Sequence, residues 1–508
     1  MHAARGVVRH LLLNANASPL SAAASQVGVY DAVKALAFVG DLSMGQPIDH
    51  SGRTAWLAAQ LAAALGLDAE TQARGHLVAL LRWSGCTANA AEFSELMGDD
   101  VNGRRLMFST PSRELPAAVR GSIGALAEIH CEVSGDVARA LGLPAKVEHG
   151  LRHMFQSFDG QGKSAGLHGH AIPVEVFLVG IAGDLEIFSR VHGLGRALGF
   201  IQARADVEYP AAMVEPVARH AADWLHSLER GAASQPRHDP TSTGLSTVPL
   251  ELIADVIDLK LPWLTGFSRK VAAAAARCAA AQGLDLAQQQ RIYRAGLVHG
   301  MGRASVPNAV WESTVTPSEG MVEQVRLVPY WTSRAVQRIG SLGDEAEIAS
   351  FIDERLDGSG FFRGARGDAI RLECQVLAAA VHWVMLQTAR PGRPALPAED
   401  AARQLRAEAT QGRFSAAVVE GLLQKTAAPA ARDTATPAAS VLSAREIEVL
   451  SRVSLGESNK EAARALGISP STVRAHLENV FRKLECTTRA AATLKALRQG
   501  LLEGAGTV

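Results

Sequence analysis

Near its carboxyl end, the chain places apolar residues at the spacing of an amphipathic helix. The apolar positions recur every three or four residues, with polar and basic residues between them: Val473, Leu477, Val480 and Leu484. A tight turn at 467–469 separates this pattern from a shorter helical pattern before it. Two such helices are typical of a helix-turn-helix, whose second helix buries one face on its scaffold and presents the other to the major groove of DNA.

The polar residues around the second helix supply the groups that DNA binding needs. Ser471 and Thr472 are expected to cap this helix, and their hydroxyls and nearby backbone amides would also suit a phosphate. Lysine and arginine side chains supply positive charge around the exposed face. On composition alone, an ordinary amphipathic helix pair is an equal alternative. The candidate DNA-binding residues are Lys460, Ser469, Ser471, Thr472, Arg474, Ala475, Glu478, Arg482 and Lys483.

Three stretches between residues 442 and 484 carry a resemblance to a known family: LSAREIEVL, SNKEAARALGIS and STVRAHLENVFRKL. They resemble the LuxR-type (GerE, or NarL/FixJ-like) DNA-binding domain. The resemblance implies that Arg474, Ala475 and Glu478 face base edges, where a carboxylate accepts a hydrogen bond from the amino group of cytosine. The family usually has glycine after the Lys-Leu pair, whereas this chain has Glu485.

The last helical pattern, RAAATLKALRQGLL, resembles the fourth helix of that family, which commonly forms the dimer contact on DNA. Its apolar stripe of Leu494, Leu497 and Leu501 would be partly exposed in a monomer. We therefore expect a four-helix domain at 440–505 that binds double-stranded DNA as a homodimer. The alternative is that the stripe packs back on the core of the domain.

Length and composition place this domain at the end of a larger, mainly α protein. A chain of 508 residues is too long for a single core. Segments 229–247 and 425–440 are rich in small residues and proline and are predicted to be linkers. They leave a first body at 26–228 and a second body at 248–424. Abundant alanine and only 5% aromatic residues favour helices throughout.

Charge and cysteine content limit the partners and the compartment. The 51 basic and 51 acidic residues balance, so any affinity for DNA must come from a local patch. The five cysteines form no C-x-x-C pair, which argues against a zinc finger or a disulfide framework and favours a reducing cytoplasm. No stretch approaches the ~18–20 apolar residues of a membrane span. We therefore expect a cytoplasmic protein without a membrane partner.

The two bodies resemble each other in sequence. HSGRTAWLAAQLAAALGL, from residue 50, corresponds to GFSRKVAAAAARCAAAQGL, from residue 266. FDGQGKSAGLHGHAIP in the first body corresponds to LDGSGFFRGARGDAI in the second, and an apolar helical pattern follows each. The repeat is too long for a solenoid unit. It predicts a duplicated all-α domain.

These residues resemble the HD-GYP branch of the HD-domain phosphohydrolases, in which histidines and carboxylates from several helices hold two or three divalent metals. In the first body, the resemblance aligns three residues with metal ligands, but Arg82–Trp83 replaces the adjacent His-Asp pair. In the second body, His299 remains from that pair and Gly300 replaces its partner. The resemblance thus implies a vestigial pocket in each body, with His50, Arg82, Trp83, His130 and Asp184 in the first and His299 in the second.

An arginine in place of a metal ligand is a fixed positive charge that disfavours a metal. We therefore expect two degenerate HD-like domains with no metal, no cofactor and no enzymatic activity. They would sense a small-molecule ligand or hold a dimer, in a DNA-binding transcriptional regulator. A purely structural role for the bodies is a further alternative. The rival is a metal-dependent phosphohydrolase, or cyclic-dinucleotide phosphodiesterase, with a DNA-binding tail.

Four further histidines lie near the DGQG turn of the first body: His149, His153, His168 and His170. Imidazoles four residues apart share one face of a helix and could form a rebuilt metal site. The interpretation that we favour is surface histidines on a helix and a loop.

Overall fold

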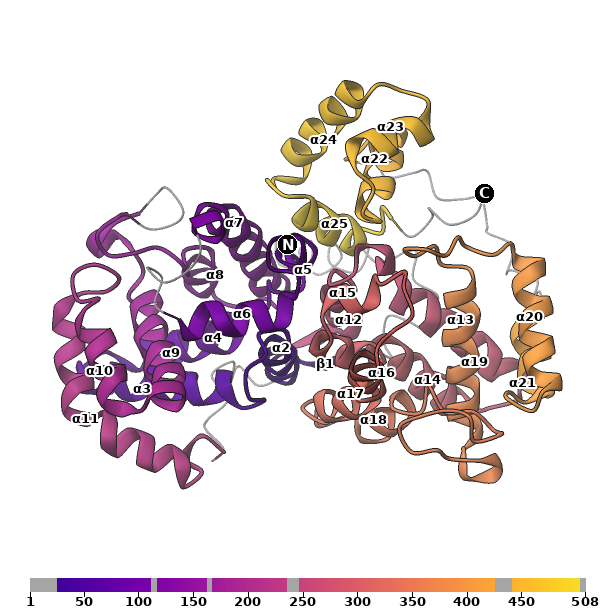
Figure 1. The fold of residues 1–508 in the computed structure, drawn as a ribbon, viewed down its shortest axis with the longest axis horizontal. Helices are drawn as coiled ribbons and strands as arrows, with labels where there is room; N and C mark the ends of the chain where they lie inside the picture. Colours follow the sequence, from indigo (N-terminus) through magenta and orange to yellow (C-terminus); the bar gives the residue numbers. More distant parts are fainter. Residues whose placement is uncertain (1–24, 111–116, 162–166, 235–245, 425–440, 503–508) are drawn as a thin grey trace, which may run out of the picture.

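The computed structural model describes residues 25–110, 117–161, 167–234, 246–424 and 441–502. These residues are mainly helical, which confirms the predicted fold class (Figure 1). The predicted linker 425–440, and most of 229–247, lies outside the described residues. The first body comprises β1 (Gln26–Gly28), α2 (Val29–Ser43), α3 (His50–Ala64), α4 (Ala69–Leu81), α5 (Ala90–Met97), α6 (Asp100–Ser109), α7 (Ala117–Ala140), α8 (Ala145–Arg152), α9 (Val174–His192), α10 (Leu194–Gln202) and α11 (Ala211–Glu229).

The second body and the C-terminal domain are also mainly helical. The second body comprises β2 (Thr247–Pro249), α12 (Leu250–Asp258), α13 (Phe267–Ala281), α14 (Leu286–Val298), α15 (Asn308–Trp311), α16 (Glu319–Arg326), α17 (Val328–Val336), α18 (Gly343–Ala349), α19 (Leu372–Leu386), α20 (Ala398–Thr410) and α21 (Ala416–Leu423). Short 3₁₀ turns connect some of these helices, including η5 (Met301–Ser305). The C-terminal domain comprises α22 (Ala444–Ser454), α23 (Asn459–Leu466), α24 (Pro470–Leu484) and α25 (Arg489–Arg498).

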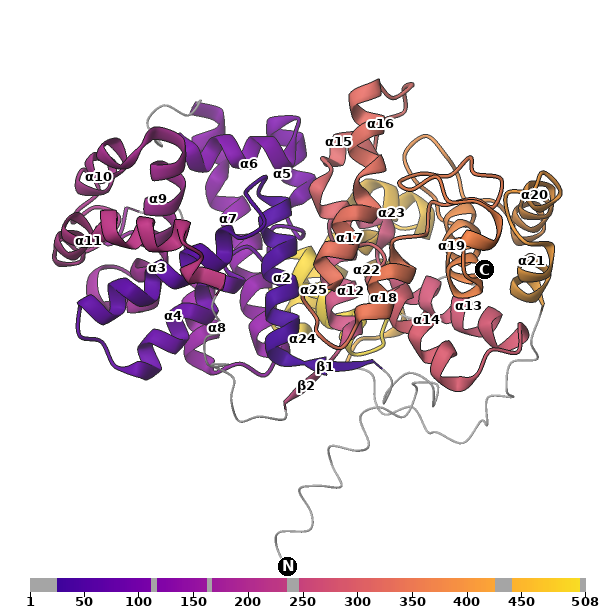
Figure 2. The ribbon, with the colours of Figure 1, turned by 90° about the horizontal axis from the view of Figure 1, so that it is seen from below.

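A two-stranded antiparallel sheet ties the start of one body to the start of the other. Strand β1 pairs with β2, with Val27 opposite Val248, and both side chains are buried. Figure 2 shows this pair at the edge of the molecule, between the two bodies. Because the sheet brings the two amino-terminal ends together, α2 and α12 pack against each other at the junction.

The two bodies form matching hydrogen bonds at corresponding positions of the sequence repeat. Before α3, the Asp41 carboxylate accepts the backbone N–H of Ser51 at 3.1 Å and its hydroxyl at 2.6 Å. Before α13, the Asp258 carboxylate accepts the same two groups of Ser268, each at 2.8 Å. Each carboxylate comes from the last helix before the connection. The same sequence repeat therefore produces the same local fold in both bodies.

Two glycines, one in each body, lie at equivalent close contacts between a turn and a helix. A Cβ added at Gly85 would lie 2.2 Å from the carbonyl oxygen of His130, and one added at Gly302 would lie 2.1 Å from that of Val328. Only glycine allows such close approach of a turn to a helix. The turn after α4 is thereby pressed against α7, and η5 against α17, so His130 and Val328 occupy equivalent positions.

A buried polar cluster joins the two bodies. Lys260 of the second body donates to Asp100 of the first body at 2.7 Å, and the backbone N–H of Asn308 donates to the same carboxylate at 2.7 Å. Arg104 lies one turn from Asp100 and is also buried, with the two groups 3.4 Å apart. Removing one member of a buried charge pair leaves the other uncompensated at a large cost. The bodies are therefore packed as one unit.

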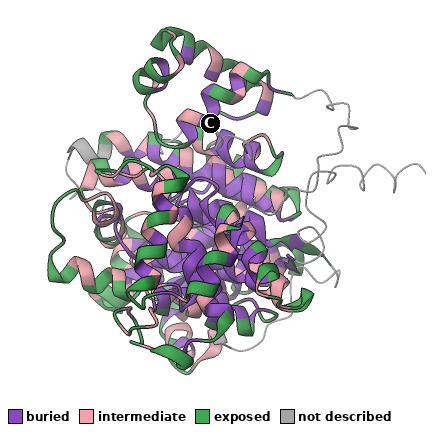
Figure 3. Cartoon of the chain, turned by 90° about the vertical axis from the view of Figure 1, so that its right-hand side faces the viewer, coloured by how far each residue is buried: buried purple, intermediate pink, exposed green. Residues whose placement is uncertain are grey.

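The C-terminal domain sits over the junction of the two bodies (Figure 1). Its small internal core consists of Val449, Val453, Ala462, Ala463, Val473 and Leu477. Other side chains of the same domain, including Leu450, Leu484 and Leu494, belong to the main core shared with the bodies. Figure 3 shows exposed residues on the outer helices of this domain and buried residues where it meets the bodies.

Candidate DNA-binding surface and HD pockets

The second helix of the helix-turn-helix, α24, begins at Pro470 after a serine cap. Ser469 is the N-cap, and its hydroxyl accepts the backbone N–H of Thr472 at 3.1 Å. This corrects the expectation that Ser471 and Thr472 cap the helix, because both lie inside its first turn. Their hydroxyls lie 2.7 and 2.8 Å from the Ser469 hydroxyl. All three side chains are exposed, at the end of the helix whose free N–H groups favour an anion.

The two faces of α24 differ as the sequence pattern predicts. Val473, Leu477, Val480 and Leu484 are buried. On the opposite face, Ala475 is exposed, and the side chains of Arg474 and Glu478 are 76% and 64% exposed. The Arg474 Nε lies 3.0 Å from Glu478 Oε1, so the two residues form an ion pair one turn apart. The three residues predicted to face base edges therefore share one accessible face.

The three predicted basic contacts have different surroundings. Lys460 is exposed near the start of α23, and Arg482 is exposed and donates to Asn479 at 3.0 Å. Lys483 instead donates to Glu446 at 2.7 Å, and Glu446 forms the capping box of α22. Lys483 therefore forms an ion pair that links α24 to α22. Its side chain remains 31% exposed, so its predicted role at the DNA stays a prediction.

Helix α25 is packed against both bodies. Leu494 is fully buried and Leu497 is 3% exposed, while Leu501 is half-buried. The helix contacts α7 of the first body and α12 of the second, as well as α22 and α24 of its own domain. The prediction that a monomer leaves this stripe partly exposed is therefore wrong. The stripe packs on the core of its own domain, as the alternative proposed, and also on both bodies.

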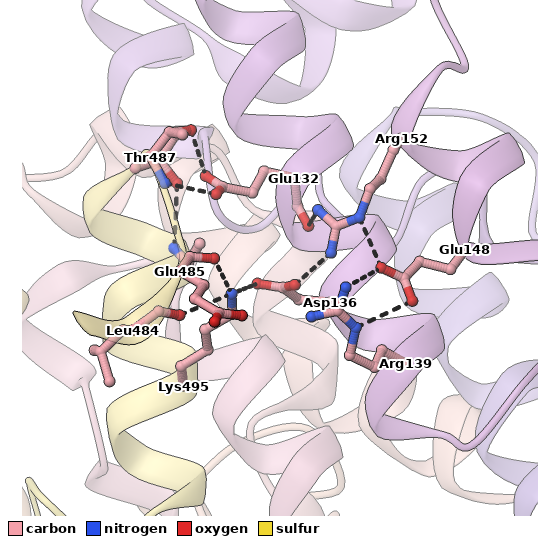
Figure 4. Close-up of polar contacts among 11 residues, drawn as sticks. Glu132, Asp136, Arg139, Glu148, Arg152, Leu484, Glu485, Thr487 and Lys495 are labelled. Carbon is pink, nitrogen blue, oxygen red and sulfur yellow. Dashed lines mark hydrogen bonds and ion pairs between the residues drawn. The ribbon is translucent and has the colours of Figure 1, made fainter. Parts of the chain in front are cut away.

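Polar contacts reinforce this packing (Figure 4). Thr487, just before α25, donates its backbone N–H and its hydroxyl to Glu132 of α7, at 2.6 and 3.0 Å. Lys495 of α25 lies 3.4 Å from Asp136, one turn further along α7. From the second body, the Thr265 hydroxyl donates to the carbonyl oxygen of Ser454 at 2.7 Å.

In the pocket of the first body, His50 is fully buried at the start of α3. Its Nδ1 donates to Glu186 of α9 at 2.7 Å, and Glu186 also contacts Arg53 and Arg190, each at 3.2 Å. Burial alone would raise the pKa of Glu186, but the hydrogen bond from His50 and the neighbouring charges lower it to about 2. Sequence reasoning missed Glu186, although it lies two residues after Asp184 in the same helical pattern.

Arg82 and Trp83 fill the place that the resemblance gives to the His-Asp pair. Both are buried, and the Arg82 guanidinium lies 4.1 Å from the centre of the Trp83 ring. A Cβ at Gly183 would lie 1.9 Å from Arg82 Nη1, so the guanidinium occupies the side-chain space of that position on α9. Burial lowers the pKa of Arg82 to about 10, which leaves it positively charged at neutral pH.

His130 lies in the same region but is neutral. Its Nε2 donates to the carbonyl oxygen of Arg82 at 2.6 Å, which leaves Nδ1 to accept from the Cys86 thiol at 3.7 Å. Burial lowers the pKa of His130 to about 4. The Asp184 carboxylate pairs with Arg204, accepts from the Tyr209 hydroxyl at 3.2 Å and acts electrostatically on Arg82. Its place in the pocket with the histidines stays a prediction.

The second HD pocket also holds an arginine. His299 is fully buried, with Nδ1 donating to the Gly296 carbonyl at 2.6 Å and Nε2 accepting from Arg303 at 3.0 Å. Burial, and then the charge of Arg303, lower the pKa of His299 to about 3. A Cβ at Gly300 would lie 2.7 Å from Arg303 Nη1, so the guanidinium fills the space next to the missing carboxylate.

The residues in these pockets do not fit a divalent metal centre. Within the described ranges, no group of three or more histidines, cysteines, aspartates or glutamates is placed to hold a metal ion. Each pocket instead contains a guanidinium, which repels a cation. Buried metal sites need several neutral or anionic ligands at once.

The four histidines near the DGQG turn lie at the surface or its margin. His149 and His153 have ring centres 4.3 Å apart, and His153 Nδ1 donates to the His149 carbonyl at 2.8 Å. His168 and His170 are exposed. His149 and His170 border a cavity of 590 Å³ with apolar walls, whose other lining residues include Leu67, Lys146, Phe177 and Met213.

Known families match two parts of the chain. Residues 251–418 match the HD domain family, and residues 440–496 match the family described as bacterial regulatory proteins, luxR family. The chain therefore carries an HD domain followed by a LuxR-type DNA-binding domain, as the sequence resemblances implied. Among the described helices, none combines the length and apolar character needed to cross a membrane.

Individual relatives align with very different shares of the chain. The 3'3'-cGAMP-specific phosphodiesterase 3 of Vibrio cholerae is 25% identical over 398 residues, which are 71% of this chain and 86% of that protein. A crystal structure of a cyclic GMP-AMP specific phosphodiesterase from V. cholerae has a TM-score of 0.56 at 21% identity, covering 78% of this chain and 97% of that one. The probable transcriptional regulatory protein NarL of Mycobacterium tuberculosis is 47% identical over 72 residues, 14% of this chain and 33% of that protein.

These relatives contradict the prediction that the chain is not an enzyme. The protein aligned with most of the two bodies is a phosphodiesterase, and the related crystal structure shares their fold. That prediction rested on the replaced ligand positions, whereas the similarity to the phosphodiesterase extends over 398 residues of the chain. Phosphodiesterase activity therefore stands as a candidate function.

Proposed function

We propose that this protein is a DNA-binding transcriptional regulator whose two HD-type bodies hold the LuxR-type domain by its fourth helix. A ligand bound by the bodies would control the release of α25, and the released helix would form a homodimer on DNA. The observation that carries this proposal is the burial of Leu494 and Leu497 against the bodies, beside an accessible face of α24.

Helix α7 offers a physical route from the first pocket to the DNA-binding domain. His130 of α7 faces the pocket and bonds to the Arg82 backbone, while Glu132 and Asp136 of the same helix hold Thr487 and Lys495. Arg152, from α8, donates to Asp136 at 2.6 Å and to the Glu132 carbonyl at 3.3 Å. A shift of α7 on ligand binding would therefore act directly on the contacts that dock α25.

The docked state leaves α24 accessible but sequesters the expected dimer contact. A single domain of this size reads one half-site, so a two-half-site operator requires a second copy. Docking should therefore limit binding to such an operator more than binding to a half-site. The five described cysteines are all free and buried, which supports a cytoplasmic location as part of the proposal.

Hydrogen exchange on the full-length protein, with and without an operator duplex, tests the proposal. On DNA, we expect amides of α25 and of residues 484–488 to lose the protection that docking gives, while α13 and α14 stay protected. Fluorescence anisotropy at several salt concentrations measures DNA binding itself. Salt-sensitive DNA binding with unchanged hydrogen exchange in α25 would contradict the release of α25, but it would still support a DNA-binding regulator. No DNA binding would reject both.

A second candidate function is hydrolysis of a cyclic dinucleotide, which the similarity over 398 residues to a cGAMP-specific phosphodiesterase favours. The test is incubation of the full-length protein with 3'3'-cGAMP and manganese, iron or magnesium, with chromatographic detection of the linear product. Turnover that is lost in His50→Ala or His130→Ala would establish the activity in the first body. Turnover that survives both substitutions would place it elsewhere.

A further inference from the structure

Arg82 is a buried cation with no acidic partner in contact. Its residue is 5% exposed, and within the described ranges no carboxylate lies within 4.0 Å of its guanidinium. Its protein contacts are a long hydrogen bond to the Val179 carbonyl, at 3.4 Å, and the face of Trp83. A buried charge is normally paired, because removal from water is costly.

The surroundings of Arg82 carry an excess of positive charge. The carboxylates of Asp184 and Glu186 both act on the charge of Arg82, but each already pairs with other arginines: Asp184 with Arg204, and Glu186 with Arg53 and Arg190. Burial raises the pKa of Asp41 well above its usual value, against the two donors of Ser51 that favour its ionised form. Among the described residues of this region, four guanidiniums (Arg53, Arg82, Arg190 and Arg204) therefore outnumber three carboxyl groups (Asp41, Asp184 and Glu186). Arg53 and Arg190 are partly exposed and face the solvent side of the cluster.

Buried polar atoms without a hydrogen-bond partner in the described structure include three on the side chains that line this pocket: Arg82 Nε, His50 Nε2 and Trp83 Nε1. Two of them are obligatory donors, the guanidinium and the indole N–H. The third, on neutral His50, is an acceptor, because its Nδ1 carries the proton given to Glu186. Two donors and one acceptor match an oxyanion that retains a hydroxyl group, such as a phosphate.

We propose that the first body binds a phosphate oxyanion directly through Arg82, at the position where the resemblance to HD phosphohydrolases implies a metal. The guanidinium replaces the metal as the cation that receives the oxyanion, and Arg53 and Arg190 attract the anion towards it. This site deepens the proposed function, because it names the ligand class to which the bodies respond. The phosphate can be free or part of a nucleotide, and the experiment separates the two.

The test is a thermal-unfolding titration of the full-length protein in a chloride-free gluconate buffer. Inorganic phosphate and 3'3'-cGAMP are added separately, up to about 50 mM and about 1 mM, with sodium chloride as the ionic-strength control. A ligand that binds only the folded state raises the Tm in a saturable manner. We expect saturable stabilisation by phosphate beyond that by chloride. Stabilisation at lower concentration by the dinucleotide would identify a nucleotide phosphate, and equal potency or less would identify free phosphate.

Arg82→Met keeps most of the side-chain volume and removes the charge. It should weaken phosphate binding by about tenfold or more. It should not lower the Tm in the gluconate buffer without phosphate, because an unpaired buried charge is lost. The matched control is Arg204→Met in the same body, which removes a paired arginine. It should lower the Tm but retain the phosphate-dependent rise.

An equal phosphate effect in Arg82→Met and in the unmodified protein would overturn the proposal. If the Arg82→Met variant does not fold, the test rests on the unmodified protein. The absence of any saturable rise in its Tm with phosphate or with the dinucleotide would then contradict the proposed site. DNA binding is measured without added phosphate. A failed anion site with intact DNA binding is therefore distinct from a failure of the regulator proposal.

Discussion

Glu132 and Thr487 are 355 residues apart in the sequence, yet the Glu132 carboxylate accepts both the backbone N–H and the hydroxyl of Thr487. This bidentate contact joins α7 of the first body to the segment before α25. It lies beside the buried stripe that the sequence assigns to a dimer. The contact therefore offers a place to test whether docking opposes DNA binding.

Glu132→Ala should weaken docking and tighten binding to a two-half-site operator. Loss of hydrogen bonds to a charged group is worth about 1–2 kcal/mol here, which corresponds to a roughly 5- to 30-fold gain in apparent affinity. Anisotropy with full-length protein measures the gain. Glu128→Ala, an exposed position one turn earlier on α7, is the matched control and should leave the affinity unchanged. An equal affinity for both variants would refute an inhibitory role of docking.

Arg474→Ala should cost about 1–3 kcal/mol of binding to the cognate operator if the side chain contacts a base edge. Its exposed ion pair with Glu478 contributes little to stability, so the domain should stay folded. Competition binding against cognate and scrambled duplexes measures the loss. Lys460→Ala is the comparison: it should weaken both duplexes alike and lower the salt slope by about 1. Equal losses on both duplexes for Arg474→Ala would reassign it to the phosphate backbone.

Glu485→Gly should stabilise the C-terminal domain by about 1 kcal/mol. Glu485 caps α24 in the left-handed conformation, with φ of 51°, where a residue with a Cβ is strained by roughly 1–2 kcal/mol. Glycine removes this strain but gains entropy in the unfolded chain. Chemical denaturation measures the change. Glu485→Ala controls for loss of the carboxylate and should be less stable than Glu485→Gly, and the reverse order would contradict the strain.

Asp258→Asn should stabilise the protein more at pH 8 than at pH 5. Burial raises the pKa of Asp258 to about 7, well above its usual value. Because the folded state holds this proton more tightly than the unfolded state, the stability from the protonated form is present at low pH. It is lost as the pH rises through about 7. Urea denaturation of both proteins across this range measures the difference, and a difference that shrinks with rising pH would contradict the raised pKa.

The local patterns of the sequence determined much of the fold. The buried face of α24, with Val473, Leu477, Val480 and Leu484, follows from helical spacing, because side chains three and four residues apart lie on one face. The duplication also follows from local signals: equal residue patterns produce the equal hydrogen bonds of Asp41 with Ser51 and of Asp258 with Ser268. Replacement of the His-Asp pair by Arg82–Trp83 was likewise readable from the chain.

Only the tertiary structure decided which residues meet across long sequence distances. The stripe of Leu494 and Leu497 is equally suited to a second copy or to the bodies, and packing on α7 and α12 selects the bodies. Asp184 aligned with the pocket, but Arg204 and Tyr209 hold its carboxylate, while Glu186 bonds to His50. One helical residue turns a side chain by about 100°, so a shift of one or two positions changes its partner. Helical spacing fixes which residues share a face, whereas the partner of that face depends on how distant helices pack.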